Sequence, residues 1–204
     1  MKFYTIKTPT IIQKFFSNYR WRFSSVPKEI YLTFDDGPTL EVTNFVLEEL
    51  KKHQAKATFF CIGKNVKKHQ NIYHKIQEEG HSVGNHTFNH LNGLLTKNTR
   101  YIENVQQASA YIVSKLFRTP YGRLKSSQAR LLQQEGYKII MWDVLSGDFD
   151  RSISPEKCLE NVLKKTTNGS IRAMVYFNFL NLLPDIVGCK RSSLFIAKLT
   201  SPPR

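Results

Sequence analysis

From residue 29 onward, short apolar runs alternate with segments whose apolar residues recur at helical spacing. The run IYLTF at residues 30–34 predicts a buried strand, and ATFFCIG at residues 57–63 predicts a second one. Between them, residues 41–53 carry apolar side chains on one face of a helix. Strands that alternate with amphipathic helices are typical of βα units around a parallel sheet, so we expect an α/β protein.

The same rhythm continues to residue 170 and then falters. The pattern predicts further helices at residues 66–80, 99–116, 126–135 and 155–166, and further strands at 81–85, near 117 and at 138–144. A chain of 204 residues suits a single domain. We therefore expect an N-terminal extension (1–28), one α/β domain (29–170) and an atypical C-terminal tail (171–204).

Composition changes this picture mainly through charge. The net charge of +14 favours contact with polyanions such as nucleic acid, anionic lipid or an acidic cell-wall polymer. A nucleic-acid-binding protein would need a basic groove with stacking aromatic residues, and we expect no specific nucleic acid partner. Three widely separated cysteines without CxxC spacing indicate neither a disulfide framework nor a thiolate zinc site. We expect a monomer.

The N-terminal residues contain no uninterrupted apolar run long enough for a signal peptide, and no segment reaches the length of a membrane span. Taken literally, the sequence predicts a cytoplasmic protein. Peripheral contact with a membrane or cell wall, through the basic surface and Ile11, Ile12, Phe15 and Phe16, is compatible with this pattern.

Polar residues gather where the predicted strands end. Asp35 and Asp36 follow the first strand, His86 and His90 follow residues 81–85, and Asp143 and Asp148 follow the residues IIMW. In parallel α/β folds, functional groups collect at the carboxyl ends of the strands. An Asp-Gly-Pro sequence is also ordinary turn chemistry, so the two aspartates alone do not define a site.

The segment NHTFNH at residues 85–90 could complete a metal site. Histidines at positions i and i+4 lie on one face of a helical turn, as in the HExxH motif, although no glutamate stands between His86 and His90. Two histidines so spaced also occur by chance on protein surfaces. Together with a strand-end aspartate they form a two-histidine, one-carboxylate set that leaves coordination positions open.

Four motifs occur together in one order: TFDDGP, HTFNH, RTPYG and WDVLSGDFD. In order and approximate spacing they resemble the polysaccharide deacetylase family, the NodB-homology domains of carbohydrate esterase family 4, over residues 29–170. The resemblance implies a distorted, incomplete (β/α) barrel. It also implies a hydrolase of linear amide C–N bonds that removes N-acetyl groups, with metal dependence, from a glycan containing N-acetylglucosamine.

The resemblance also implies roles for residues near the two aspartates. Asp36, His86 and His90 would ligate Zn²⁺, with Co²⁺, Ni²⁺ and Mn²⁺ as alternatives. Asp35 would be the general base, and Arg118 would keep it ionised. A surface ion pair is the alternative interpretation of Arg118.

Three further residues would contact substrate, and a fourth would act through a histidine. Pro120, Tyr121 and Trp142 would lie in the substrate site, with the Tyr121 backbone N–H stabilising the oxyanion and Trp142 lining the sugar groove. Core packing is the alternative for Trp142. Asp148 matches the family's acid that orients a catalytic histidine.

That histidine is missing from the place where the resemblance predicts it. All six histidines precede residue 91, and NGSI at 168–171 is followed by RAMVYFNF. Because this histidine protonates the departing amine in the family, its loss predicts impaired turnover. Three explanations remain open: a changed reading frame, a divergent enzyme in which Tyr176 or water donates the proton, and a catalytically silent carbohydrate-binding relative that keeps the metal site.

Overall fold

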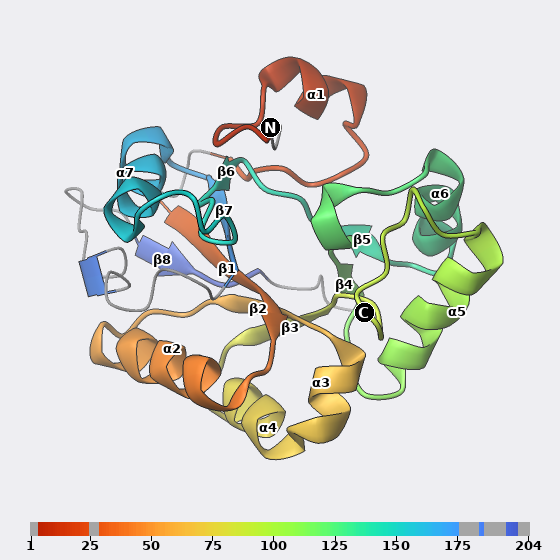
Figure 1. Ribbon diagram of the computed structural model, residues 1–204, viewed down its shortest axis with the longest axis horizontal. Coiled ribbons are helices and arrows are strands. Elements are labelled where there is room, and N and C mark those ends of the chain that lie inside the picture. The colour runs from red at the N-terminus through yellow and green to blue at the C-terminus, as the bar shows by residue number, and fades with distance from the viewer. Residues whose placement is uncertain (1–3, 25–28, 176–183, 186–194, 200–204) are drawn as a thin grey trace.

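The computed structural model describes residues 4–24, 29–175, 184–185 and 195–199. It shows a curved parallel sheet with most helices around its outside, while α1 stands apart at the top of the view in Figure 1. The strands are β1 (Glu29–Gly37), β2 (Thr58–Cys61), β3 (Ser82–Asn85), β4 (Leu116–Phe117), β5 (Lys138–Ile139), β6 (Val144–Leu145), β7 (Ile171–Val175) and β8 (Phe195–Ala197). The helices are α1 (Thr10–Phe15), α2 (Leu40–Lys52), α3 (Gly63–Lys68), α4 (Gln70–Glu78), α5 (Asn98–Ser109), α6 (Ser126–Gln134) and α7 (Pro155–Lys165), with a 3₁₀ turn at Pro120–Gly122.

The strand order explains why the barrel is incomplete. It runs β5-β4-β3-β2-β1-β7-β6, with β8 paired in addition to the start of β1. Strands β5 and β6 are neighbours in sequence but lie at opposite ends of this order. The expected α/β fold, a distorted and incomplete barrel, is confirmed.

The predicted strand at 138–144 is wrong in its middle. The Ile140 N–H donates to Phe117 O at the end of β4, whereas the Asp143 N–H donates to Ile171 O at the start of β7. Residues 140–143 therefore cross from one end of the sheet to the other and cannot continue a single ladder. An apolar run satisfies either arrangement, so the pattern did not reveal the crossing.

The described N-terminal residues pack along this crossing. Arg20 pairs with Ile140 in parallel and Lys7 pairs with Val144 in antiparallel orientation. The Lys7 ammonium lies 2.7 Å from a carboxylate oxygen of the fully buried Asp143. The N-terminal segment thus covers the place where β5 and β6 do not meet.

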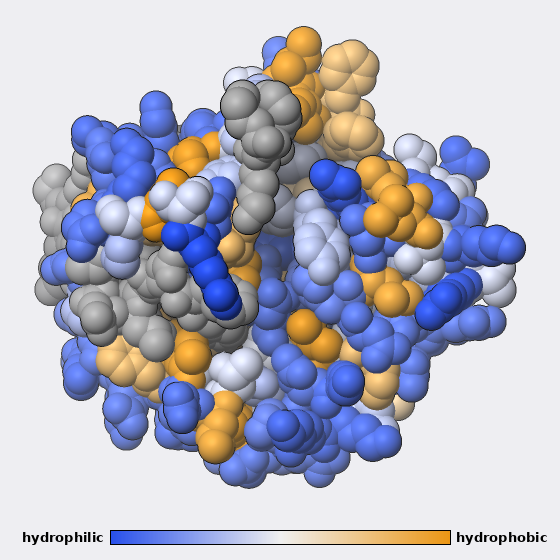
Figure 2. Space-filling view, viewed as in Figure 1, coloured by the Kyte–Doolittle hydropathy of each residue, from blue (hydrophilic) through white to orange (hydrophobic). Residues whose placement is uncertain are grey.

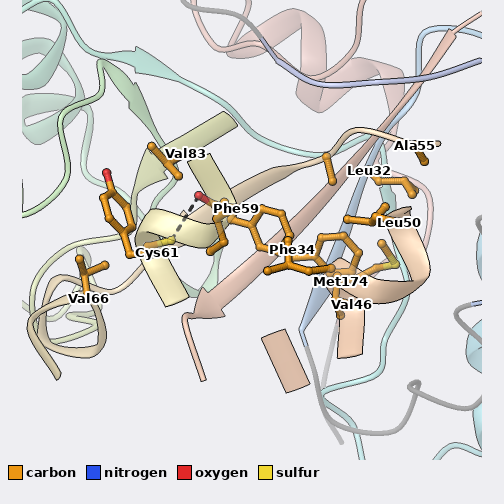
Figure 3. Packing of buried hydrophobic residues seen from close by; sticks show 14 of the residues in the cluster. Leu32, Phe34, Val46, Leu50, Ala55, Phe59, Cys61, Val66, Val83 and Met174 are labelled. Atoms are coloured by element: carbon orange, nitrogen blue, oxygen red, sulfur yellow. Dashed lines mark hydrogen bonds between the residues drawn. The ribbon is translucent and has the colours of Figure 1, made fainter. Parts of the chain in front are cut away.

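The main core fills the space between the sheet and α2 (Figure 3). Leu32 and Phe34 of β1 pack with Phe59 of β2, and Val46 and Leu50 bring the apolar face of α2 against them. All five are at most 2% exposed. Burying each such side chain is worth about 1.5–3 kcal/mol, so this cluster fixes β1 and with it the aspartates at its end.

The helix predicted at 66–80 is split into α3 and α4 at His69. Val66 and Ile72 are six residues apart, which in one continuous helix would point them about 120° from each other. The break buries both side chains, at 1% and 2% exposure. The expected stop at Gly80 is confirmed, since Gly80 follows α4 with φ of +78°.

Helix α5 ends at Ser109, earlier than the predicted residue 116. No helix in the described ranges is long and apolar enough to cross a bilayer.

Candidate metal and catalytic site

Strand β1 carries both aspartates within it, rather than ending before them. Its register with β2 shifts between Asp35 and Gly37, and Asp36 has φ of +69° at this irregularity. An L-residue seldom adopts this conformation, and such strain clusters at functional sites. The Asp35 residue is 5% exposed, while the Asp36 side chain keeps 26% exposure.

Asp36 meets both candidate histidines. Its Oδ1 lies 3.3 Å from His86 Nε2 and 3.0 Å from His90 Nε2. One ligand atom from each residue falls within 4.8 Å of the others. The structure therefore brings together the three residues that the sequence selected as a metal-binding set.

The two histidines do not lie on a helical turn, contrary to the expectation from their spacing. They lie on a loop after β3 in which Thr87 and His90 have φ of +63° and +56°. Side chains take up the backbone donors of this loop: Asn85 Oδ1 accepts from the Thr87 N–H at 2.8 Å, and Asn104 Oδ1 accepts from two further loop amides. These side-chain acceptors replace helical hydrogen bonds.

The second ring nitrogen of each histidine also has a partner. His86 Nδ1 lies 2.8 Å from the Arg118 carbonyl oxygen, and His90 Nδ1 lies 3.1 Å from the Tyr121 hydroxyl. A carbonyl can only accept, so His86 carries a proton on Nδ1, and its Nε2 faces Asp36. Such outer partners are typical of metal-ligating histidines.

A divalent cation fits this donor set. Asp36 Oδ1 is buried, and within the described residues no hydrogen bond of good geometry reaches it. One carboxylate and two imidazoles match Zn²⁺ and similar ions and leave positions for water or substrate. The set can therefore hold one divalent ion.

The same contacts shift the pKa values of the set. Burial disfavours the charged form of Asp36, but the two histidines outweigh it and hold the pKa of this carboxyl below its usual range. Burial likewise disfavours charged His86, but Asp36 and Asp35 outweigh it and raise the pKa of His86.

Arg118 is fully buried beside the general-base candidate. Its Nη1 donates to Asp35 Oδ1 at 2.7 Å and to Thr33 Oγ1 at 2.6 Å, and its Nε donates to Ile140 O at 3.1 Å. The Arg118 side chain has 0% exposure, so a surface ion pair is excluded. Burial lowers the pKa of Arg118, and the nearby Asp35 carboxylate opposes that effect.

The predicted substrate residues lie next to this cluster. Pro120 is buried in the 3₁₀ turn, and Tyr121 is 63% exposed with φ of +59°. Trp142 is half-buried against the same loop, since a Cβ on Gly122 would come within 2.7 Å of its ring. The Trp142 ring also packs against a core cluster, as the alternative interpretation expected, and its contact with sugar stays a prediction.

Asp148 follows β6 in the chain and lies fully buried against Val175, the last residue of β7. Both of its carboxylate oxygens accept from the Val175 N–H, at 2.9 and 2.8 Å, and Ser146 Oγ donates to one of them. Burial raises the pKa of Asp148 to about 7. Val175 stands opposite Asp35 in the β1–β7 register. Tyr176, considered above as a proton donor, lies outside the described residues.

Sequence reasoning misplaced one residue and missed two others. Asp143 does not join the site but binds Lys7 and accepts a hydrogen bond from Ser170 Oγ at 2.6 Å. Thr33 and Asn104, which position Arg118 and the histidine loop, were not identified. The available signal for Thr33 was its position two residues before Asp35 on the same strand, where it is buried. Asn104 gave no signal, because it lies on α5, far in sequence from the histidine loop.

An incomplete α/β barrel with a two-histidine, one-aspartate set at the carboxyl edge of its strands defines the class of this protein. The chain belongs to the polysaccharide deacetylase family, whose family model matches residues 24–140.

Related proteins and structures agree with this assignment. Over 149 residues the chain is 36% identical to a peptidoglycan-N-acetylglucosamine deacetylase of Bacillus cereus, covering 70% of this chain and 54% of that protein. The chain thus spans about half the length of that relative.

Two solved structures extend the comparison. The Bc1960 peptidoglycan N-acetylglucosamine deacetylase, in complex with an N-hydroxybenzamide, superposes with a TM-score of 0.82 at 29% identity, covering 94% of this chain and 95% of that chain. A mutant of BA3943 from Bacillus anthracis, described as a CE4 family pseudoenzyme with restored enzymatic activity, gives 0.78 at 25% identity, covering 88% and 68%.

Proposed function

We propose that this chain is a metal-dependent N-deacetylase of N-acetylglucosamine-containing glycans whose turnover is slowed by an incomplete proton-donating half. One observation carries the proposal: Asp36, His86 and His90 converge beside Asp35, which a buried Arg118 holds. Two of the similar proteins reported above are peptidoglycan N-acetylglucosamine deacetylases, which supports peptidoglycan as the substrate. Chitin-like oligomers contain the same acetylated sugar and are the alternative.

Asp36, His86 and His90 would hold the ion. When bound, a divalent ion at this place supplies Lewis acid chemistry, polarising the amide carbonyl and making water more acidic. Both histidines present Nε2, because their Nδ1 atoms are engaged by Arg118 O and the Tyr121 hydroxyl.

Asp35 would accept the proton of the attacking water. Arg118 binds its Oδ1, and no hydrogen bond from the described residues reaches Oδ2, which is therefore available as the acceptor. The adjacent guanidinium donates to Oδ1 and so fixes the orientation of the carboxylate. The backbone N–H of Tyr121 would donate to the developing oxyanion, and losing one such donor typically costs about 10²–10³ in rate.

Protonation of the departing amine is the weak step. Val175 faces the same side of the sheet as Asp35, because paired residues on parallel strands share a face. The Asp148 carboxylate binds the backbone of Val175 directly. Position 175 is therefore where a donor oriented by Asp148 would stand, and a valine there has no proton to give.

A catalytically silent glycan-binding protein is the second candidate. The valine at position 175 favours it, because the metal set is complete without this position. The similarity to a pseudoenzyme structure supports the same alternative. The two candidates differ only in whether acetate is released.

Metal binding can be tested directly by titrating chelator-treated protein with Zn²⁺ in a calorimeter. We expect one site, and His90→Ala should weaken it by more than the roughly 10–100-fold that loss of an outer partner of a ligand typically costs, because it removes a ligand itself. His74→Ala is the matched control, since His74 is exposed on α4. Equal affinity for the wild type and His90→Ala would contradict the proposed set.

A further inference from the structure

The N-terminal segment carries the densest group of exposed apolar side chains in the described chain. We define residues 9–19, which include α1, as the N-terminal finger. Ile11, Ile12, Phe15 and Phe16 are 63%, 39%, 80% and 40% exposed, and they are four of the ten large apolar residues found exposed. Figure 2 shows apolar atoms projecting at the top of the molecule, where Figure 1 places α1.

The finger is held firmly at both ends. Before it, the Thr8 N–H and hydroxyl donate to Asp143 O at 2.9 Å and to Trp142 O at 2.8 Å. After it, the Arg20 N–H donates to Ile139 O and the Met141 N–H donates to Arg20 O, both at 2.8 Å. The exposed apolar side chains are therefore presented by an anchored element rather than by a loose end.

Contacts within the finger and to α6 fix its shape. The Trp21 indole N–H donates to Phe16 O at 3.0 Å, and Phe16 stacks on Tyr19 with ring centroids 5.4 Å apart. Asn18 and Gln133 exchange hydrogen bonds of 3.2 and 3.1 Å. Apolar side chains held out in this way mark an interaction surface.

The charge around the finger selects its partner. Residues 1–28 contain no aspartate or glutamate and six basic residues: Lys2, Lys7, Lys14, Arg20, Arg22 and Lys28. Lys14 is exposed on α1, Arg20 and Arg22 are exposed just after the finger, and Lys138 is exposed on the neighbouring β5. A second copy of this chain would place like charges against one another, whereas an anionic bilayer attracts them.

We propose that the N-terminal finger inserts its apolar side chains into the headgroup region of an anionic lipid bilayer. Aromatic and aliphatic side chains on one short element with basic residues beside them are typical of interfacial binding. The proposal is independent of the deacetylase function.

The finger and the candidate metal site are built from different parts of the fold. The finger is anchored at residues 139–145, and Arg22 beyond it pairs with Ser170 just before β7. Asp36, by contrast, lies at the carboxyl end of β1 and His86 just beyond that of β3. The finger's anchors and these two candidate metal ligands therefore come from different segments of the chain.

Vesicle sedimentation tests the proposal with the full chain. Vesicles of equal parts phosphatidylglycerol and phosphatidylcholine should bind wild-type protein, and vesicles of phosphatidylcholine alone should bind it at least about tenfold more weakly. Ile11→Ser with Phe15→Ser should reduce binding to the anionic vesicles at least about tenfold. Val113→Ser with Leu95→Ser is the matched control, because these side chains are 79% and 82% exposed elsewhere.

Two further arms separate charge from apolar insertion and from metal binding. Lys14→Glu with Arg20→Glu should weaken vesicle binding, as should about 1 M salt, at which the Debye length falls to about 3 Å. In the Phe15→Trp variant, the fluorescence of the introduced tryptophan should shift to shorter wavelength when anionic vesicles are added. Chelator treatment should leave vesicle binding unchanged.

Three results would overturn the proposal. The first is no sedimentation of wild-type protein with anionic vesicles, and the second is equal binding by the wild type and the Ile11→Ser, Phe15→Ser variant. The third is a wild-type dimer in light scattering that this variant abolishes, which would assign the finger to contact between copies.

Discussion

The two halves of the candidate site are built to different degrees. On the β1–β3–β4 side, Asp36, His86 and His90 converge. The fully buried Arg118 forms an ion pair with Asp35 on the same side. On the β6–β7 side, Asp148 is just as buried, but it binds only a backbone amide and a serine hydroxyl among the described residues. The first half sets its two acids against histidines and an arginine, whereas the acid of the second half has no charged partner among the described residues.

This difference separates two tasks that a deacetylase combines. In the proposed mechanism, holding a metal and activating water would depend on the β1–β3–β4 side alone. Protonating the leaving amine depends on what stands at the end of β7. The comparison therefore predicts a chain that binds its ion fully and turns over slowly.

The largest expected effect comes from completing the second half. Val175→His would place an imidazole beside Asp35 with Asp148 below it, and general acid catalysis is typically worth about 10²–10⁴-fold. We expect kcat for acetate release from N-acetylglucosamine oligomers to rise within this range. Val175→Leu, which adds volume without a proton donor, is the control, and an equal rise in both variants would contradict the interpretation.

Breaking the first half should cost stability as well as activity. Arg118→Met leaves the Asp35 carboxylate buried without its cation, which typically costs about 3–5 kcal/mol in free energy of unfolding. Urea unfolding measures this cost. Adding Asp35→Asn to Arg118→Met should recover most of it, because the unpaired charge is then gone. A loss below about 1 kcal/mol for Arg118→Met, the size of an exposed pair, would show that the pair is weak.

Asp148, which has no cationic partner among the described residues, should make stability depend on pH. Burial raises the pKa of folded Asp148 to about 7 from its ordinary value of 3.8. Between these values the folded chain keeps a proton that the unfolded chain has released, so Asp148 supports folding below about pH 4 and loses that support as pH rises to about 7.

Comparison with Asp148→Asn isolates this dependence. Relative to that variant, the wild type should lose up to about 1.4 kcal/mol of unfolding free energy per pH unit between about pH 4 and 7. Urea unfolding at several pH values checks it. A pH-independent difference between the two proteins would mean that Asp148 is ionised throughout.

The smallest effect concerns the outer partner of one histidine. Tyr121→Phe removes the hydroxyl 3.1 Å from His90 Nδ1, and loss of such a partner typically weakens metal affinity about tenfold. Zinc calorimetry measures the change, with Tyr111→Phe as the control. Unchanged affinity would show that the loop alone orients His90.

Many of the strands and helices could be predicted from local patterns, because the spacing of apolar residues differs between strands and helices. Helix α2 and the Gly80 stop lay where expected, and strand β1 began where expected but extends through both aspartates to Gly37. The split of 138–144 did not, since an apolar run does not state which neighbouring strand it pairs with. The break at His69 was not predicted either, because it depends on the burial of both Val66 and Ile72, which the local pattern does not specify.

The candidate site was accessible to sequence reasoning for a different reason. Parallel strands bring their carboxyl ends to one edge, so Asp36 and His86 could be placed together without knowing the loops between them. The loop itself was misjudged: His86 and His90 are held by Asn85 and Asn104 rather than by a helical turn. Such side-chain caps depend on tertiary contacts that residue spacing does not encode.

Acetate release from N-acetylglucosamine oligomers by zinc-loaded wild-type protein, beside Asp35→Asn, tests the central claim most directly. The account predicts slow release that requires the metal and disappears in Asp35→Asn while zinc affinity is retained. Release that continues undiminished in Asp35→Asn would contradict the assignment of the base. No release from a protein with its zinc demonstrably bound would contradict the enzyme and leave a glycan-binding relative.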